Sequence, residues 1–184
     1  MVSRRTVLKL SAAGISMPLS GCTEIADFRL NASPVTISSV VPDEFPGMLD
    51  AKLTKAPSSE RPPQVRFQYR NTTDRSTSIL FNFPAPFSPA LINRVDGDAK
   101  LWLGPISWDR DYLDDCWTIP EIRHPDDRER LTIPPKKAVW RDSNIYNHAD
   151  NADCYPAGTY EAEDTIEVEG REFRWRVEIT ISNE

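Results

Sequence analysis

The sequence predicts an all-β fold, in the form of an antiparallel β-sandwich. Short segments that alternate apolar and polar residues recur from residue 35 onward, with turn residues between them. No convincing helix pattern separates these segments, and 16 prolines against 7 glycines argue against long uninterrupted helices. Regularly spaced strands without intervening helices favour a sandwich over a βαβ sheet.

The length of the chain allows one ordinary domain. Of 184 residues, 1–21 are predicted to be a removable signal peptide, 22–34 a lipidated tether and 35–184 the folded domain. The hydrophobic content of 39% is enough for one packed core.

The N-terminus carries two export signals at compatible spacing. Arg4 and Arg5 match the twin-arginine pattern, and the weakly apolar stretch that follows, 10–19, is too short to span a bilayer. The run Leu19-Ser20-Gly21-Cys22 resembles a lipobox, in which the Cys22 thiol receives the lipid. We therefore predict twin-arginine export and anchoring at the outer face of the cytoplasmic membrane. The alternative is an amphipathic helix with a chance arginine pair and a buried cysteine.

Residues 3–22 resemble the signals of surface lipoproteins of salt-loving archaea. The tether after them has little periodicity. It contains Asn31 in an Asn-x-Ser triplet, and Asn71 stands in an Asn-x-Thr triplet within a polar break. Both asparagines are candidate N-glycosylation sites.

Nine strand signals follow the tether. They cover 35–41, 49–53, 65–69, 79–83, 100–103, 130–133, 138–140, 159–168 and 173–181. The last one alternates most plainly, with Phe173, Trp175 and Val177 on one face of the strand.

Two hairpins are predicted between these strands. Gly170 can take the positive φ of a tight turn between 159–168 and 173–181. The polar run 70–75 is expected to join 65–69 to 76–81 in the same way.

The hairpin at 65–75, the run 131–136 with Trp140, and Tyr155-Pro156-Ala157-Gly158-Thr159-Tyr160 resemble patterns of immunoglobulin-like surface domains. The closing pattern is similar to that of the bacterial intracellular proteinase inhibitor fold. This resemblance covers residues 63–181 loosely, and the middle segment does not match it. It implies an immunoglobulin-like sandwich with a long irregular insertion at 84–125.

Cys116 and Cys154 remain as an even pair once Cys22 is assigned to the lipid. In an oxidising exterior they are predicted to form a disulfide. The alternative is a zinc site made by these two cysteines with His124 and His148. The chain lacks the closely spaced ligand pairs that structural zinc sites usually have.

Four carboxylates stand within seven residues, which makes this segment a candidate calcium site. They are Asp109, Asp111, Asp114 and Asp115. The segment lacks the glycine and the distal glutamate of an EF-hand, so a solvated acidic loop is the competing interpretation.

Four of the five tryptophans fall into two groups in this interpretation. Trp140 and Trp175 lie in strand patterns and are predicted to be core residues. Trp108, Tyr112 and Trp117 flank the acidic segment and are a candidate platform for a glycan or peptide. Local packing of the insertion is the alternative.

The charge and motifs narrow the classes of function. The formal charge is −6, and removal of the signal makes it more negative by three charges, which disfavours nucleic acid as a partner. We find no nucleophile elbow, phosphate loop, zinc-protease motif or dinucleotide fingerprint, and predict no cofactor.

The sequence thus predicts a non-enzymatic, lipid-anchored binding module at the cell surface, with a protein, peptide or glycan partner. A proteinase inhibitor and, third, a surface hydrolase are the alternatives.

Overall fold

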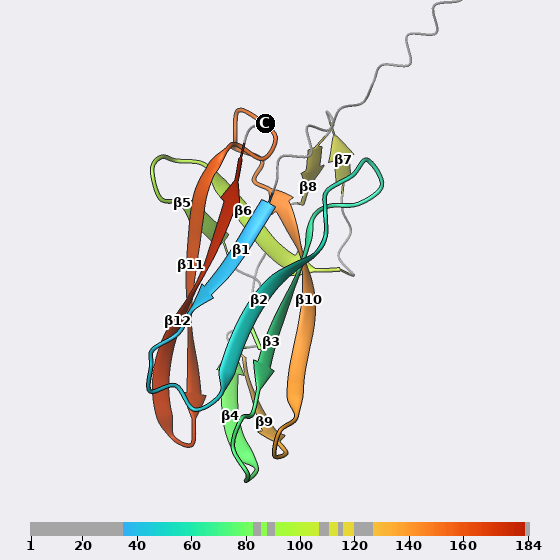
Figure 1. The fold of residues 1–184 in the computed structure, drawn as a ribbon. Coiled ribbons are helices and arrows are strands. Elements are labelled where there is room, and N and C mark those ends of the chain that lie inside the picture. The colour runs from blue at the N-terminus through green and yellow to red at the C-terminus, as the bar shows by residue number, and fades with distance from the viewer. Residues whose placement is uncertain are drawn as a thin grey trace, which may run out of the picture.

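The computed structural model describes residues 35–82, 86–87, 91–106, 111–113, 116–119 and 127–182, with Pro105 and residues 111–113 described by their backbone alone. These residues form strands and no helix (Figure 1). The strands are β1 (Val35–Val40), β2 (Met48–Lys55), β3 (Gln64–Arg70), β4 (Thr77–Asn82), β5 (Leu91–Arg94), β6 (Lys100–Pro105), β7 (Asp111–Leu113), β8 (Cys116–Thr118), β9 (Arg128–Ile133), β10 (Ala138–Asn147), β11 (Gly158–Val168) and β12 (Arg171–Ile181). The predicted all-β class is confirmed. Among these residues there is no helix long and apolar enough to cross a membrane.

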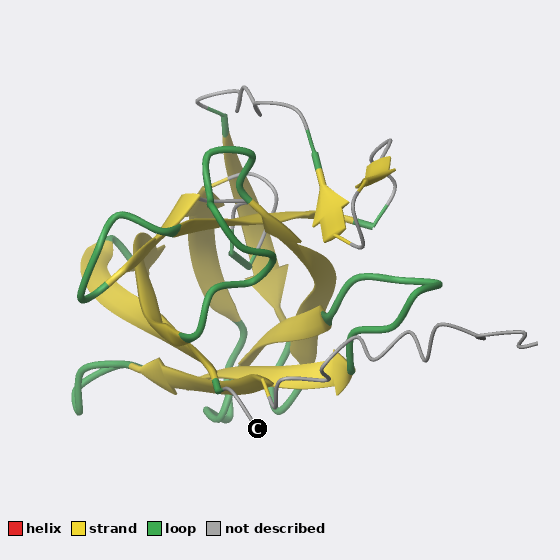
Figure 2. Ribbon diagram, turned by 90° about the horizontal axis from the view of Figure 1, so that it is seen from above, coloured by secondary structure: helices red, strands yellow, loops and turns green. Residues whose placement is uncertain are grey.

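The main strands form one continuous sheet that curls round a core (Figure 2). One half of the sheet has the order β9-β4-β11-β12-β1, and the other has the order β5-β6-β10-β3-β2. The halves join where β5 pairs with the start of β11, through Arg94 and Tyr160. All pairings are antiparallel except a single parallel bridge between Asn147 and Thr118. The two halves therefore face each other across one interior.

The chain of paired strands β1-β12-β11-β5-β6-β10-β3-β2 runs through both halves. Its two end strands, β1 and β2, lie side by side (Figure 1). No backbone ladder joins them in the described pairings. A side-chain bond does so instead, because the Ser39 hydroxyl donates to the carbonyl of Leu49 at 3.2 Å. The sheet thus closes on itself with a seam.

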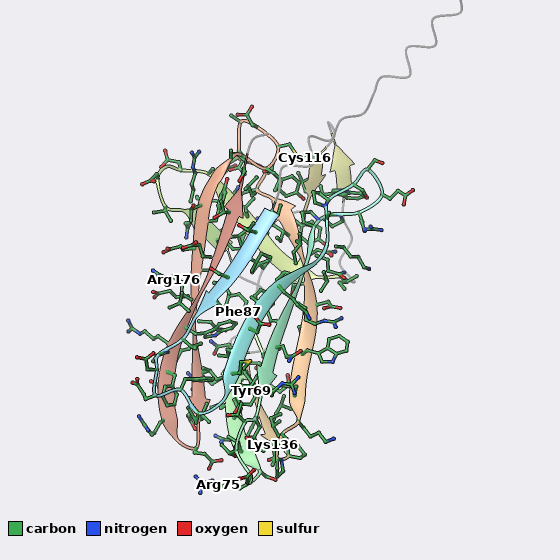
Figure 3. All side chains as sticks on the ribbon, in the orientation of Figure 1. Tyr69, Arg75, Phe87, Cys116, Lys136 and Arg176 are labelled. Atoms are coloured by element: carbon green, nitrogen blue, oxygen red, sulfur yellow. A yellow bond between two sulfur atoms is a disulfide. The ribbon has the colours of Figure 1, made fainter. Side chains whose placement is uncertain are left out.

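The core is built from the alternating residues of strands in both halves. The predicted inward face of β12 is buried, and Trp175 is its largest member. Its ring meets Phe67 of β3 edge to face at 6.1 Å and Phe87 at 4.8 Å, and Phe87 stacks on Phe67 at 4.6 Å. Phe87 thereby fills the interior between the two halves (Figure 3). Aromatic contacts of this kind add to the free energy of area burial.

One of the two predicted hairpins is confirmed. Strands β11 and β12 pair along their whole length, and the turn between them has two consecutive residues of positive φ, Glu169 at 50° and Gly170 at 81°. This is the backbone of the two-residue turns that match strand twist.

The other predicted hairpin, at residues 70–75, is wrong. Strand β3 pairs with β2 and β10, whereas β4 pairs with β9 and β11, so the turn carries the chain from one half to the other. Asn71 explains the change of direction. Its buried side-chain amide donates to the carbonyls of Arg75, Ile133 and Pro134, which ties this turn to the turn after β9.

The prediction that segment 84–125 is irregular is wrong in part, because this segment contains strands. It supplies β5 and β6, which lie between β11 and β10, and it supplies Phe87 to the core. The immunoglobulin-like topology stays a prediction. What the structure establishes is an antiparallel all-β domain with the Cys116–Cys154 disulfide.

Candidate functional site

The outer surface of β2, β3 and β10 presents three rows of side chains. Strand register places one residue of each strand in every row. We call this surface the Trp140 face, and its rows are Met48, Arg70, Ala138; Asp50, Gln68, Trp140; and Lys52, Arg66, Asp142. The intervening residues of these strands, such as Phe67 and Tyr69, point inward and are buried.

Trp140 is exposed and yet held in place. It is 54% exposed, and the Arg66 guanidinium lies 4.1 Å from the centre of its ring. Arg66 is itself fixed by two bonds to Asp142, at 2.7 Å from Nε and 2.8 Å from the terminal nitrogen. The guanidinium lies over the ring, and more than half of the residue remains exposed.

The same pair favours the charged form of the guanidinium. The hydrogen bond to Asp142 raises the pKa of Arg66 above its usual value. Planar, two-point contact between guanidinium and carboxylate also sets the orientation of both groups. The aromatic surface is therefore preorganised.

Trp140 was predicted to lie in the core, and this is wrong. The register of β10 against β3 puts Trp140 opposite Gln68, on the outer surface, while its neighbour Val139 faces inward opposite Tyr69. The sequence did contain a signal for this, since Ala138 and Asp142 share the parity of Trp140 in the strand. A small and a charged residue in alternation with Val139 indicate a solvent-facing row.

Farther along β10 the same outer surface is covered. Tyr146 on β10 and Trp102 on β6 stand opposite each other and are buried under Trp117 and Ile119. The indole nitrogen of Trp117 donates to the carbonyl of Ser58 at 2.9 Å. The Cys116–Cys154 bond ties the β7–β8 hairpin to the loop after β10. We call the part of the outer surface formed by Trp102, Trp117, Ile119 and Tyr146 the covered half.

A row of polar side chains separates the covered half from the Trp140 face. Gln64 and Asn144 are buried in it, and the Gln64 amide donates to the Asn144 carbonyl oxygen at 3.5 Å. The Asn144 amide in turn donates to the Tyr146 hydroxyl at 2.8 Å. Paired in this way, these groups avoid the cost of buried polar atoms without partners.

The predicted aromatic platform is not supported at Trp117. This residue is 7% exposed and belongs to the covered half, so it is not available to a ligand. Tyr112 lies in β7, opposite Trp117, with its backbone alone described. Trp108 lies outside the described residues. Local packing, the alternative interpretation, accounts for Trp117.

The predicted metal ligands are placed only in part. Asp111 lies in β7, where its side chain is not described, and Asp109, Asp114 and Asp115 fall outside the described residues, so calcium stays a prediction. Among the described residues no group of three or more metal-ligating side chains occurs.

The disulfide confirms the predicted pairing of Cys116 with Cys154 and leaves neither thiol for the alternative zinc site. His148 stacks on Trp102 at 5.5 Å, and its Nδ1 accepts the backbone N–H of Asp150 at 3.1 Å. His124, the remaining candidate ligand, lies outside the described residues.

The structure counts against a glycan at Asn71. The residue is fully buried, its amide nitrogen is used by three carbonyls, and its oxygen accepts the N–H and hydroxyl of Thr73. It caps a turn, so the predicted modification at this position is wrong for the folded chain. Asn31, Cys22, Arg4 and Arg5 lie outside the described residues.

Comparison with known proteins adds no relative. No protein-family model matches the chain, and neither the curated proteins nor the solved structures show a significant match to it.

Proposed function

We propose that this protein is an exported, lipid-anchored interaction module without catalytic activity, and that it binds a protein partner through the Trp140 face. The observation that carries the proposal is an exposed tryptophan ring held rigid by Arg66 and Asp142. A ring fixed before binding loses little conformational freedom when a partner covers it.

The composition of the face supports a protein partner. Trp140 and Met48 are among the most exposed large apolar residues, at 54% and 52%, and Arg66 and Arg70 stand beside them. Tryptophan, methionine and arginine are the residue types enriched in protein interfaces, and tryptophan and arginine in their energetic centres.

The position of the first residue of β1 supports the anchoring. Val35 pairs with Ile181, so β1 begins at the end of the domain where β12 finishes (Figure 1). A tether of residues 22–34 reaches at most about 45 Å. Anchoring at Cys22 attaches the domain by that end, opposite the turns after β3 and β9.

A tyrosine contact supports the immunoglobulin-like fold. The Tyr160 hydroxyl donates to the carbonyl of Pro156 at 2.6 Å, within the Pro156-x-Gly158-x-Tyr160 motif. Tyrosine corners of immunoglobulin domains likewise bond to the backbone a few residues upstream.

Two experiments test the proposal. The intact mass of the membrane-extracted protein is expected to show a chain that begins at Cys22 with a lipid-sized addition. A Met1 chain without modification would refute the anchoring.

For binding, a photo-crosslinking residue replaces Asp50 on the Trp140 face, and Arg174 on the opposite outer surface in the control. On intact cells we expect a dominant protein adduct from position 50 that Trp140→Ala abolishes, with no such adduct from position 174. An adduct that survives Trp140→Ala contradicts binding through this face.

A further inference from the structure

Four exposed cations stand at one end of the Trp140 face, and we call them the basic tip. They lie in or beside the turn between β3 and β4 and the turn between β9 and β10, and they are Arg70, Arg75, Lys136 and Lys137. Figure 3 shows Arg75 and Lys136 at the same end of the molecule, away from Cys116.

The two turns form one rigid unit. The Asn71 backbone N–H donates to the carbonyl of Lys137 at 2.9 Å, and its side chain donates to Ile133 and Pro134 at 3.0 and 3.2 Å. The Lys136 ammonium donates to the carbonyl of Thr72 at 2.7 Å. The cations are therefore mounted on backbone that is fixed by hydrogen bonds on both sides.

Most of this positive charge is not neutralised within the described part of the chain. Asp74 is the one carboxylate in these two turns, and it pairs with Lys136 at 2.9 Å. Among the described residues Arg70, Arg75 and Lys137 have no ion pair. A local excess of cations in a chain with 28 carboxylates against 22 lysines and arginines is opposite in sign to the whole.

The basic tip is continuous with the apolar part of the Trp140 face. Arg70 lies between Met48 and Ala138 in the first row, and Lys137 precedes Ala138 directly. Trp140 stands in the next row. One surface therefore offers cations and exposed apolar groups to the same ligand.

From this juxtaposition we infer that the occupant of the Trp140 face is an acidic polypeptide segment that carries an apolar side chain beside its carboxylates. The inference rests on the proposed function and deepens it. Charge complementarity directs the carboxylates to Arg70, Arg75 and Lys137. Met48 favours a polypeptide over a glycan, since a flexible thioether adapts to apolar side chains.

The test uses the membrane-extracted protein in detergent and two polymers, poly-L-glutamate and a random copolymer of glutamate and tyrosine. We expect saturable binding of both, with the copolymer tighter. Arg70→Glu/Arg75→Glu/Lys137→Glu is expected to weaken both by at least about tenfold at low ionic strength, an effect that shrinks as salt is added. Trp140→Ala is expected to remove only the advantage of the copolymer.

A matched control separates local from global charge. Lys55→Glu/Arg61→Glu/Arg174→Glu makes the same change in net charge at exposed positions away from the basic tip, and should change affinity less than about twofold. Equal weakening by both triple variants overturns the inference. Binding of heparin, or of a phosphatidylglycerol vesicle, as tight as that of the copolymer also overturns the inference. Self-association that the Arg70, Arg75 and Lys137 variant abolishes overturns it as well.

The two proposals fail in distinguishable ways. If the cellular adduct depends on Trp140 while the affinity for the polymers does not depend on the basic tip, the acidic partner is refuted and binding through the Trp140 face is retained. If the polymers bind through the basic tip while Trp140→Ala leaves the adduct unchanged, the proposed function is refuted.

Discussion

The covered half and the Trp140 face share the outer surface of β10, yet they meet solvent differently. Along β10, Tyr146 is buried beneath Trp117, whereas Trp140 is 54% exposed. Strand alternation gives both residues the same orientation. What differs is the cover, a hairpin and a disulfide over one and a single guanidinium over the other. Burial on this surface is thus decided by tertiary cover and not by residue type.

The largest effect should come from removing the clamp of the covered half. Cys116→Ala/Cys154→Ala opens a loop of 38 residues, for which the chain-entropy model gives a loss of about 4 kcal/mol in the free energy of unfolding. Urea denaturation measures the loss, and Trp117 fluorescence should shift to the red. Unchanged stability would show that packing alone holds the hairpin.

The cover itself is tested by Trp117→Ala. Loss of a large buried ring and of its bond to Ser58 should cost about 3 kcal/mol in urea denaturation, near the lower limit for such changes because the cluster is small. Val40→Ala, at an exposed apolar position on the other outer surface, serves as the control and should change stability little.

Alkaline pH tests the core directly beneath the Trp140 face. Burial raises the pKa of Tyr69 from 10.0 to about 12. Above pH 10 the unfolded chain loses the phenol proton that the folded chain keeps, so stability is full below pH 10. It falls on the order of 2–3 kcal/mol towards pH 12.

Tyr69→Phe should flatten this fall, at a cost of about 1 kcal/mol at neutral pH for the lost bond to the Pro46 carbonyl. Denaturation across the alkaline range measures both effects. Tyr160, whose pKa is also raised by burial, leaves a residual slope. The same slope in the variant and the wild type would show that Tyr69 is not responsible.

The smallest effect on stability should come from the Trp140 face. Trp140→Ala should change the free energy of unfolding by less than about 1 kcal/mol, since more than half of the residue is exposed. Asp142→Asn should leave the unfolding midpoint nearly unchanged and release Arg66, which lowers the fluorescence anisotropy of Trp140. A large loss of stability in Trp140→Ala would identify it as a packing residue.

Local patterns in the sequence were sufficient wherever local chemistry decides the structure. The β11–β12 hairpin follows from alternation and from the positive φ that Gly170 permits. The disulfide follows from the pair of cysteines that remains once Cys22 is assigned to the lipid. Both features depend on few residues.

The features that sequence reasoning missed are decided by distant contacts. A polar run after β3 looks like a hairpin turn, whereas the Asn71 bonds to Ile133 and Pro134 hold this turn against the turn after β9. Trp140 has the residue type of a core position, and its register with Gln68 sets it outside. The short strands β5, β7 and β8 have too few residues to show a period.

The placement of β1 also bears on mechanical load. Its six residues pair antiparallel with β12, from Val35 at the end of the domain where the chain enters to Val40. Under the proposed anchoring, the tether pulls on Val35 while a partner at the basic tip pulls the opposite end of the domain. The force then runs along the strands and loads the rungs between β1 and β12 together, in shear, instead of peeling them one by one. A surface module attached in this way resists extraction by flow or by a moving partner.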